Sequence, residues 1–343
     1  MSMEETTDTM HPSPKGQNRQ SSVGDDQYLD ELIDASELDL ASAKLLGAGA
    51  FGEVRLATWR GTPIALKTSH EDVPEFEKKL FFREFRTMAK LRHPNIVQFL
   101  GYVDDPFSIA LEYLPNGDLK SFWQKNRLPY LKKVGISIDL LRALAYMHNR
   151  KPSAVIHRDV KPANIMMTAS GVAKLSDFGL ARMMMVKREG QSFSAGGKFC
   201  SGSQENSTER KSNARVAETC KSNSNDDSFG NAAKDSAVSS NVGTKRYMAP
   251  EVTAGTYTYV VDVYSAGATL YELFEESPFD PPTPSYAMSP TSVRPIISKM
   301  CAGVPSDRPT AVQAISLFEE LYPKGTTLGS KNVMPASCNC VIS

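Results

Sequence analysis

The stretch that decides the fold is His157-Arg158-Asp159-Val160-Lys161-Pro162-Ala163-Asn164, and Asp177-Phe178-Gly179 follows it after a short apolar run. Asp159 is expected to accept a proton from a hydroxyl group, and Lys161 to neutralise charge on a transferred phosphoryl group. Asn164 and Asp177 offer the oxygen ligands that hard cations bridging phosphates prefer. Together the two stretches predict phosphoryl transfer that depends on a divalent cation.

A glycine-rich stretch lies closer to the N-terminus and reads Gly47-Ala48-Gly49-Ala50-Phe51-Gly52-Glu53-Val54. Apolar alternations typical of strands flank it, so its glycines are predicted to form a hairpin tip whose backbone closes over phosphates. Because the pattern alone is weak, a flexible hairpin is the competing interpretation. A dinucleotide-binding fold would need a helix directly after the glycines, whereas residues 54–57 alternate like a strand.

A lysine and a glutamate further along the chain complete this interpretation. Lys67 ends a strand pattern, and Glu84 lies on the amphipathic helix predicted over residues 75–91. Such a pair can form a buried ion pair that aims the ammonium group at phosphates, although two solvated surface residues are the alternative. His157 is predicted to be a packed core histidine, since no His or Cys lies at ligand spacing from it.

Composition bounds the partners and the compartment. The chain has 343 residues with 39 Lys plus Arg and 39 Asp plus Glu, and no basic stripe, so nucleic acid is not expected as a main partner. Its five cysteines form no Cys-x-x-Cys pair, and the N-terminus lacks a signal-peptide pattern. Without an apolar stretch long enough to span a bilayer, we expect a cytoplasmic protein.

The organisation along the chain is mixed α+β. Strand patterns dominate up to residue 112, including 96–100 and 108–112, whereas the apolar runs 131–148 and 261–274 predict buried helices. Three further segments lack the apolar residues that would repay the entropy of ordering them. They are a disordered acidic arm over 1–38, a Ser-rich disordered insertion over about 191–241, and a flexible tail over 323–343.

Taken together, these motifs resemble those of the eukaryotic protein kinase family from about residue 40 to residue 321. Ala249-Pro250-Glu251 and Asp307-Arg308-Pro309-Thr310 follow in the family's order, with Arg308 expected to pair with Glu251. The resemblance implies a bilobal protein kinase fold over 39–322, with ATP and Mg²⁺ between the lobes. A small β-rich N-lobe would cover about 39–112 and a larger helical C-lobe about 115–322, with the disordered insertion inside the activation segment.

The resemblance also implies site roles. Asp159 would be the catalytic base, supported by Lys161, Lys67 and Glu84, while Asn164 and Asp177 would hold the metal. The residues implied to contact ATP are Gly47, Ala48, Gly49, Ala50, Phe51, Gly52, Val54, Ala65, Lys67, Glu112, Leu114 and Met166. Of these, Glu112 and Leu114 would bind adenine through their backbones, and the apolar side chains would sandwich it; ordinary core packing is their alternative role.

The implied function is transfer of the γ-phosphoryl group of MgATP to Ser/Thr hydroxyls of protein substrates in signalling. Lys161 and residues 243–249 imply the serine/threonine type, and residues 93–101 look most like the tyrosine-kinase-like group. Two alternatives stay open. One is a kinase-fold scaffold or pseudokinase tethered to membrane by its tail. The other is a small-molecule kinase, which residues 243–251 disfavour because in protein kinases this segment shapes the peptide platform.

Regulation is expected at the activation segment. Arg158 could pair with a phosphate placed there by an upstream kinase, and Ser239 or Ser240 is the expected phosphosite. Thr244 is implied instead to support Asp159 and Lys161 structurally. Between residues 274 and 294 a short Pro-rich stretch replaces a longer helical region of the family, which is interpreted as a trimmed loop that leaves catalysis intact.

The C-terminus ends in Cys340-Val341-Ile342-Ser343, which fits a prenylation signal whose terminal Ser favours farnesyl. One prenyl chain binds membranes weakly, so palmitoylation of Cys338 would strengthen the attachment. The sequence thus predicts association with the cytosolic face of membranes, with an unmodified tail as the alternative.

Overall fold

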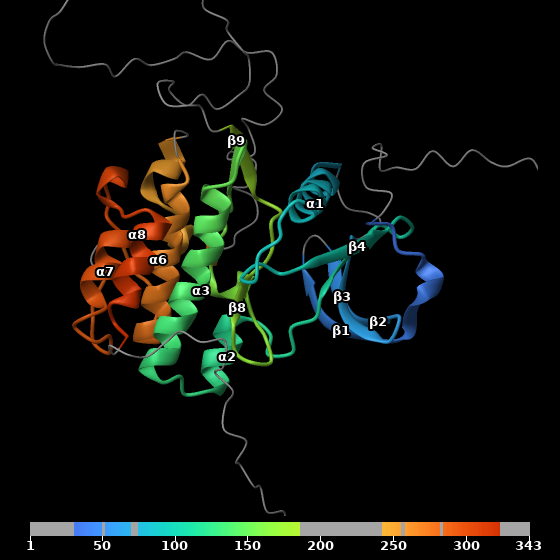
Figure 1. The fold of residues 1–343 in the computed structure, drawn as a ribbon, viewed down its shortest axis with the longest axis horizontal. Helices are drawn as coiled ribbons and strands as arrows, with labels where there is room; N and C mark the ends of the chain where they lie inside the picture. The colour runs from blue at the N-terminus through green and yellow to red at the C-terminus, as the bar shows by residue number, and fades with distance from the viewer. Residues whose placement is uncertain are drawn as a thin grey trace, which may run out of the picture.

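The computed structural model describes residues 31–49, 52–69, 75–185, 242–254, 258–281 and 284–322. They form a smaller, sheet-rich N-lobe and a larger, mostly helical C-lobe (Figure 1). The bilobal α+β fold predicted from the sequence is therefore confirmed. The predicted disordered insertion and flexible tail lie outside the described residues.

The N-lobe is a five-stranded antiparallel sheet with strand order β1-β2-β3-β5-β4 and one helix. The elements are β1 (Leu38–Gly49), β2 (Gly52–Trp59), β3 (Thr62–Ser69), α1 (Glu75–Met88), β4 (Phe99–Val103) and β5 (Ser108–Glu112). Phe85 of α1 is fully buried against the rings of Phe99, Tyr102 and Phe107, which fixes the helix to the sheet.

One strand differs from its prediction, because β4 begins at Phe99 and not at Ile96. Ile96 makes an isolated bridge to Leu175 of the C-lobe, and the amide of Val97 donates to the Leu175 carbonyl at 2.9 Å. Ile96 and Val97 therefore contact the C-lobe and are not part of the N-lobe sheet.

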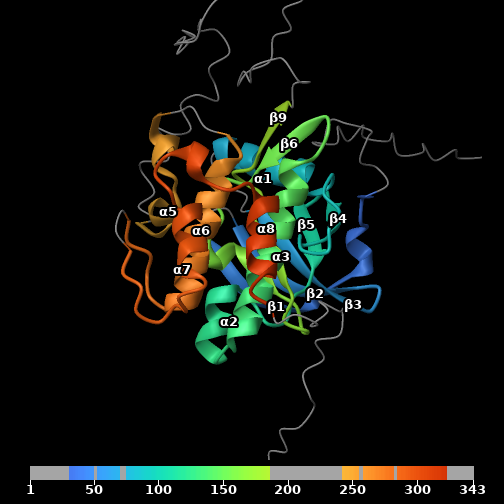
Figure 2. The same cartoon turned by 60° about the vertical axis from the view of Figure 1, so that its left-hand side comes forward.

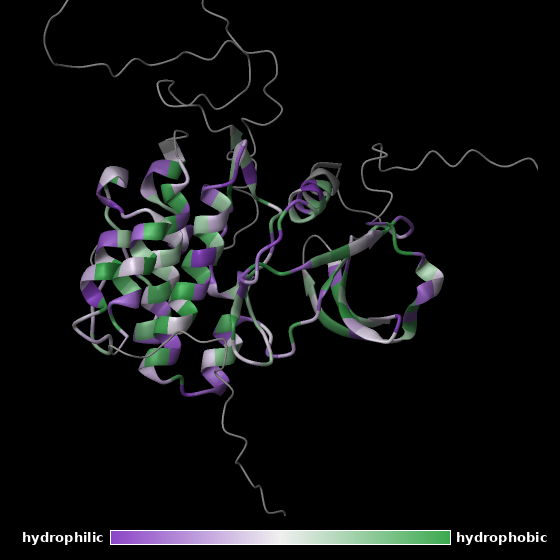
Figure 3. Cartoon of the chain, in the orientation of Figure 1, coloured by the Kyte–Doolittle hydropathy of each residue, from purple (hydrophilic) through white to green (hydrophobic). Residues whose placement is uncertain are grey.

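The C-lobe is built around α6 (Val260–Glu275), which is buried along almost its whole length. The other elements are α2 (Leu119–Lys125), α3 (Tyr130–His148), β6 (Ser153–Ile156), β7 (Ile165–Met167), β8 (Ala173–Leu175), β9 (Arg182–Met185), α5 (Val242–Tyr247), α7 (Arg294–Met300) and α8 (Ala311–Glu319). Helix α6 contacts both α3 and α7, and α8 packs on α3 (Figure 2). Figure 3 shows these helices banded in green and purple, as expected for amphipathic helices that pack against one another.

Short two-stranded sheets frame the loops that carry the motifs. Strand β6 pairs with β9, and β7 pairs with β8. The stretch 157–164 therefore leaves β6 and enters β7, while residues 176–181 connect β8 to β9. Both motif loops emerge from the same small framework, which brings them together under the N-lobe sheet.

The sequence predicted a disordered arm over residues 1–38, and this prediction is wrong for residues 31–38, which pack on the N-lobe. Leu32 forms a parallel bridge to Tyr102, and Ala35–Glu37 is a 3-10 helix capped by the Asp34 side chain. Ile33 is only 3% exposed and Leu38 9%, so two apolar residues anchor a segment that is acidic on average. Residues 1–30 lie outside the described part of the chain. Within that part, no helix has both the length and the apolar composition that crossing a membrane requires.

Candidate active site

The centre of the site is Lys67 on β3. Its Nζ lies 2.5 Å from Glu84 Oε2 on α1 and 3.6 Å from Asp177 Oδ1 after β8. Burial opposes the charge on Lys67, but attraction by Glu84 and Asp177 outweighs it and raises the pKa of the ammonium group. One cation thus joins the sheet, the helix and the C-lobe, and remains positively charged at neutral pH.

Asp177 lies in the loop after β8 with a left-handed backbone, φ 61°. The next residue, Phe178, is fully buried and meets the His157 ring edge-on at 4.9 Å, which turns Asp177 towards Lys67. Burial opposes ionisation of Asp177, yet the positive charge of Lys67 outweighs it and holds the pKa of the carboxyl below its usual value. Asp177 is therefore an anionic oxygen donor at neutral pH.

Asp159 is held by two neighbours of its own loop. Lys161 Nζ lies 2.7 Å from Asp159 Oδ2, and Asn164 Nδ2 donates both to that oxygen and to the Asp159 carbonyl, each at 2.9 Å. This leaves the amide oxygen of Asn164 for a cation. Ser176 donates from its amide to the Asn164 carbonyl at 2.9 Å, so the two expected metal ligands come from adjacent backbone segments.

Residues 157–164, here called the catalytic loop, are anchored by Asp262 of α6. This residue is fully buried. Its carboxylate accepts from the amides of His157 and Arg158, each at 2.8 Å, and from His148 Nε2 at 2.9 Å. These donors outweigh the cost of burial and lower the pKa of Asp262. The sequence places Asp262 at the start of an apolar helix, which is a signal that a partner is required, but nothing in the sequence identifies His148 as that partner.

The prediction that His157 is a core histidine is confirmed. Its side chain is fully buried, and Nε2 lies 2.9 Å from the Ser176 carbonyl. No group of three His, Cys, Asp or Glu in the described ranges is arranged to hold a metal ion by itself. Arg158 has a left-handed backbone with φ 68°, and its Nε donates to the Leu180 carbonyl at 2.6 Å.

The predicted nucleotide contacts that the structure describes lie on β1, β2, β3, β5 and β7 and just after β5. Gly47 pairs with Val54 and Gly49 with Gly52, while Ala50 and Phe51 at the hairpin tip lie outside the described residues. A Cβ on Gly52 would be 1.9 Å from the Thr68 carbonyl oxygen, so only glycine lets β2 approach β3 here.

Three of the predicted adenine contacts lie on three different elements. Ala65 is on β3 and Leu114 follows β5, while Met166 on β7 forms a bridge to Asp118. Glu112 ends β5, where its amide donates to the Gln98 carbonyl at 3.0 Å. The expected adenine-binding residues are thus contributed by both lobes.

A salt bridge also connects the lobes beside these residues. Glu112 Oε1 lies 2.5 Å from Lys174 Nζ on β8 and accepts from the Gln98 amide at 2.7 Å. Sequence reasoning assigned Glu112 a backbone role only, and Lys174 carries no signal in the sequence that would have predicted this pair.

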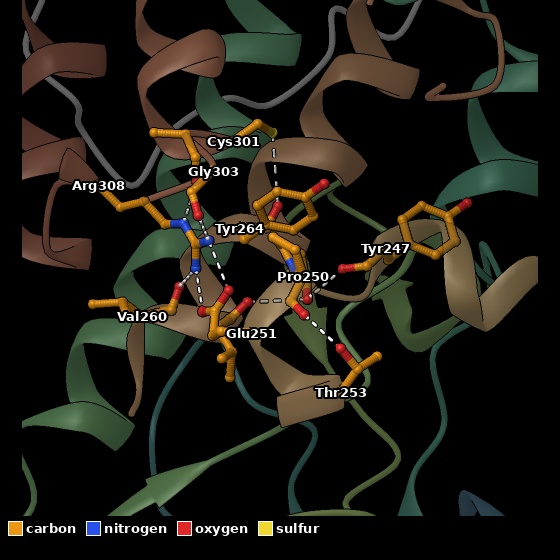
Figure 4. A network of polar contacts seen from close by, with 12 residues as sticks. Tyr247, Pro250, Glu251, Thr253, Val260, Tyr264, Cys301, Gly303 and Arg308 are labelled. Atoms are coloured by element: carbon orange, nitrogen blue, oxygen red, sulfur yellow. Dashed lines mark hydrogen bonds and ion pairs between the residues drawn. The ribbon is translucent and has the colours of Figure 1, made fainter. Parts of the chain in front are cut away.

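Downstream, the predicted pair of Glu251 and Arg308 is confirmed (Figure 4). Two parallel contacts of 2.5 and 2.9 Å join the guanidinium to the carboxylate, and the Arg308 side chain is fully buried. The guanidinium also lies 4.9 Å from the Tyr264 ring centroid. Tyr247 donates to Glu272 of α6 at 2.8 Å, so residues 245–251 are tied to the C-lobe core.

Residues 287–289, in the described part of the Pro-rich stretch, are held against the end of α6. Glu275 accepts from the amides of Ala287, Met288 and Ser289 at 2.9, 2.7 and 2.7 Å, which fold the loop back onto the end of α6. Burial opposes ionisation of Glu275, but these donors lower its pKa. Ser239, Ser240, Cys338, Cys340 and the Thr244 side chain lie outside the described residues, so their roles remain predictions.

Comparison with known proteins finds matches to two protein kinase family models and to several serine/threonine-protein kinases. Residues 40–200 match a family model described as protein tyrosine and serine/threonine kinase, and residues 227–317 match one described as protein kinase domain. Serine/threonine-protein kinase VIK of Arabidopsis thaliana is 32% identical over 256 residues, which cover 72% of this chain and 48% of that protein.

Two further relatives are also named serine/threonine-protein kinases. A probable serine/threonine-protein kinase of Dictyostelium discoideum is 30% identical over 310 residues, covering 84% of this chain and 43% of that protein. Serine/threonine-protein kinase CTR1 of Arabidopsis thaliana is 36% identical over 180 residues, covering 50% of this chain and 21% of that protein. The chain spans less than half the length of each of these relatives.

Proposed function

Since the chain belongs to the eukaryotic protein kinase family, we propose that it is an ATP-dependent protein serine/threonine kinase. The observation that carries the proposal is Lys67 placed between Glu84 and Asp177, at 2.5 and 3.6 Å. A charged ammonium held in this way is suited to the phosphates of a nucleotide, and Asp159 lies in the neighbouring loop.

The reaction joins a substrate hydroxyl oxygen to the γ-phosphorus of ATP and breaks the bond to the β-phosphate oxygen, so ADP leaves. Asp159 accepts the hydroxyl proton, and Lys161 beside it balances charge on the transferred group. Glu84 keeps Lys67 directed at the phosphates. Positioning and electrostatic stabilisation supply most of the acceleration.

Mg²⁺ fits the residues present, because Asp177 and the amide oxygen of Asn164 are hard oxygen donors on hydrogen-bonded backbone segments. Bound there, it would neutralise charge on the phosphates. Gly52 lets β2 approach β3 and so shapes the hairpin that covers the nucleotide. Val54, Ala65 and Met166 supply apolar contacts for adenine.

The test is phosphate transfer from labelled MgATP to Ser/Thr and Tyr peptides. We expect transfer to Ser/Thr peptides that is lost in Asp159→Asn and Asp177→Asn but kept in Arg142→Met, a matched change on the exposed surface of α3. Absence of transfer by the unmodified protein, with nucleotide binding intact, would favour the scaffold instead.

Finer features are proposed from the sequence. Membership of the tyrosine-kinase-like group rests on residues 93–101, and Ser239 or Ser240 is proposed to receive an activating phosphate that pairs with Arg158. Mass spectrometry of active protein that finds no phosphate on either serine would count against that role.

The C-terminal sequence supports farnesylation of Cys340, palmitoylation of Cys338 and location in the cytoplasm on the cytosolic face of membranes. Labelling with a farnesyl analogue, compared between the unmodified protein and Cys340→Ser, tests this. Equal labelling of both, or of neither, would contradict it.

A further inference from the structure

Residues 31–38, here called the N-terminal segment, cross the N-lobe sheet from one edge strand to the other. At the β4 edge the Ile33 amide donates to the Tyr102 carbonyl at 2.7 Å. The segment then leads into β1, the opposite edge of the sheet. Ile33 and Leu38 form a small core with residues from the sheet: Ala57, Ile64, Leu66, Val103 and Ala110. The segment thus covers one face of the sheet.

Two features of the sheet residues favour packing of the N-terminal segment on the sheet. A Cβ on Gly101 of β4 would be 2.7 Å from the Glu31 carbonyl oxygen and 2.7 Å from Ile33 Cδ1, so glycine leaves room for the segment. Near β1, Glu37 accepts from Trp59 Nε1 and Arg60 Nε, both at 2.9 Å. The N-terminal segment is therefore fixed at both of its ends.

The same segment reaches the helix that carries Glu84. Glu31 Oε1 lies 3.6 Å from Arg92 Nη2, just beyond α1. Nη1 of Arg92 donates to the carbonyls of Leu91 and Met88 at 3.1 and 3.5 Å. The Met88 carbonyl also accepts from the Leu91 amide at 3.0 Å. Because carbonyls at a helix C-terminus carry partial negative charge, a guanidinium there stabilises the helix end. Met88 lies one helical turn beyond Glu84.

We propose that Arg92 is a positioning residue for phosphoryl transfer. It fastens the C-terminal turn of α1 to the N-terminal segment through Glu31, and so holds Glu84 opposite Lys67. The inference rests on the proposed kinase activity. Arg92 touches neither nucleotide nor substrate in this role, and it acts only through the placement of Glu84.

The experiment compares kcat/KM for peptide phosphorylation in Arg92→Met, Arg92→Lys and the control Arg142→Met. Arg142 on α3 forms a similarly exposed pair with Glu319 on α8 at 3.3 Å. If Arg92 positions Glu84, kcat/KM should fall roughly three- to tenfold in Arg92→Met. Arg92→Lys keeps the charge and should recover part of the activity, whereas Arg142→Met should equal the unmodified protein.

Repeating Arg92→Met in a Glu84→Gln background separates positioning from a general loss of stability. If Arg92 acts through Glu84, it adds no further loss there; the same fold-loss in both backgrounds overturns the proposal. Activity of Arg92→Met equal to that of Arg142→Met overturns it as well.

Amide hydrogen exchange of α1 gives a readout that does not depend on activity. Faster exchange over residues 84–91 in Arg92→Met than in Arg142→Met supports the inference, and equal exchange overturns it. If the unmodified protein transfers no phosphate, the proposed function fails and this measurement still decides the role of Arg92.

Discussion

Replacing Asp262 by Asn tests how the catalytic loop is held. The carboxylate accepts three hydrogen bonds, from His148 Nε2 and from the amides of His157 and Arg158. An asparagine keeps one oxygen and turns an NH₂ group towards at least one of these donors. That donor is then buried without an acceptor, and the remaining bonds lose their charge.

The cost follows from these contacts. Losing one charge-assisted hydrogen bond costs about 1.5–3 kcal/mol, and leaving a buried N–H unpaired costs about 1–3 kcal/mol more. We therefore expect Asp262→Asn to lower the free energy of unfolding by roughly 3–5 kcal/mol, a large share of the roughly 5–15 kcal/mol of an ordinary domain. Because Asp159 directly follows the two amides that Asp262 holds, kcat should fall roughly tenfold or more.

The assay is urea unfolding followed by fluorescence and circular dichroism, with kcat measured at low temperature. Asp139→Asn is the matched control. Asp139 is also largely enclosed, and it accepts from the Ala173 amide at 3.1 Å and from the Asn95 side chain, so fewer backbone amides depend on it than on Asp262. Burial raises the pKa of Asp139, so loss of its charge should cost little. A loss in Asp262→Asn below about 1 kcal/mol, or no larger than in Asp139→Asn, would refute the reasoning.

Three further changes test other parts of the structure. Arg308→Ala leaves the Glu251 carboxylate without its guanidinium and should lower the free energy of unfolding by about 3–5 kcal/mol in urea; an effect under about 1 kcal/mol would contradict a buried, paired role. Gly52→Ala forces a Cβ into the β3 backbone and should raise the KM for ATP, whereas Gly303→Ala, with open space around its Cβ, should leave it unchanged. The lowered pKa of Asp177 means that its ionisation stabilises the fold above its ordinary value of 3.8, and this contribution is lost as pH falls below that value. Unfolding free energy measured from pH 5 downward should therefore fall less steeply in Asp177→Asn, and an equal slope would argue against the shift.

The spacing of apolar residues in the sequence predicted the helices and strands that bury one regular face. The helix carrying Glu84 packs its apolar face on Phe99 and Tyr102 of β4. Ile64 and Leu66 of β3 pack on the side of the N-terminal segment, so strand alternation places Lys67 on the opposite face of the sheet. The long apolar helix α6 could be predicted because burial on every side needs apolar residues at nearly every position. These parts of the fold follow from local pattern plus burial.

Contacts made by single residues in atypical surroundings could not be predicted in the same way. Ile33 and Leu38 lie among acidic residues, so the average composition of residues 1–38 concealed two anchors. Ile96 looks like part of a strand but bridges to Leu175 in the other lobe. The partnership of His148 with Asp262 joins positions far apart in sequence, and no periodicity links them.

Helix α1 is held near its C-terminal end by both lobes, and this gives its placement a physical basis. The amide of Arg92 donates to the Tyr146 hydroxyl at 3.1 Å, and Arg150 Nη1 donates to the Lys90 carbonyl at 2.8 Å; both partners belong to α3 or the turn after it. On the other side, the Arg92 guanidinium contacts Glu31 of the N-terminal segment. These contacts lie just beyond the end of α1, so both lobes contribute to the placement of Glu84. The N-terminal segment is therefore part of the catalytic unit, and a shortened protein intended for activity measurements should begin before Glu31.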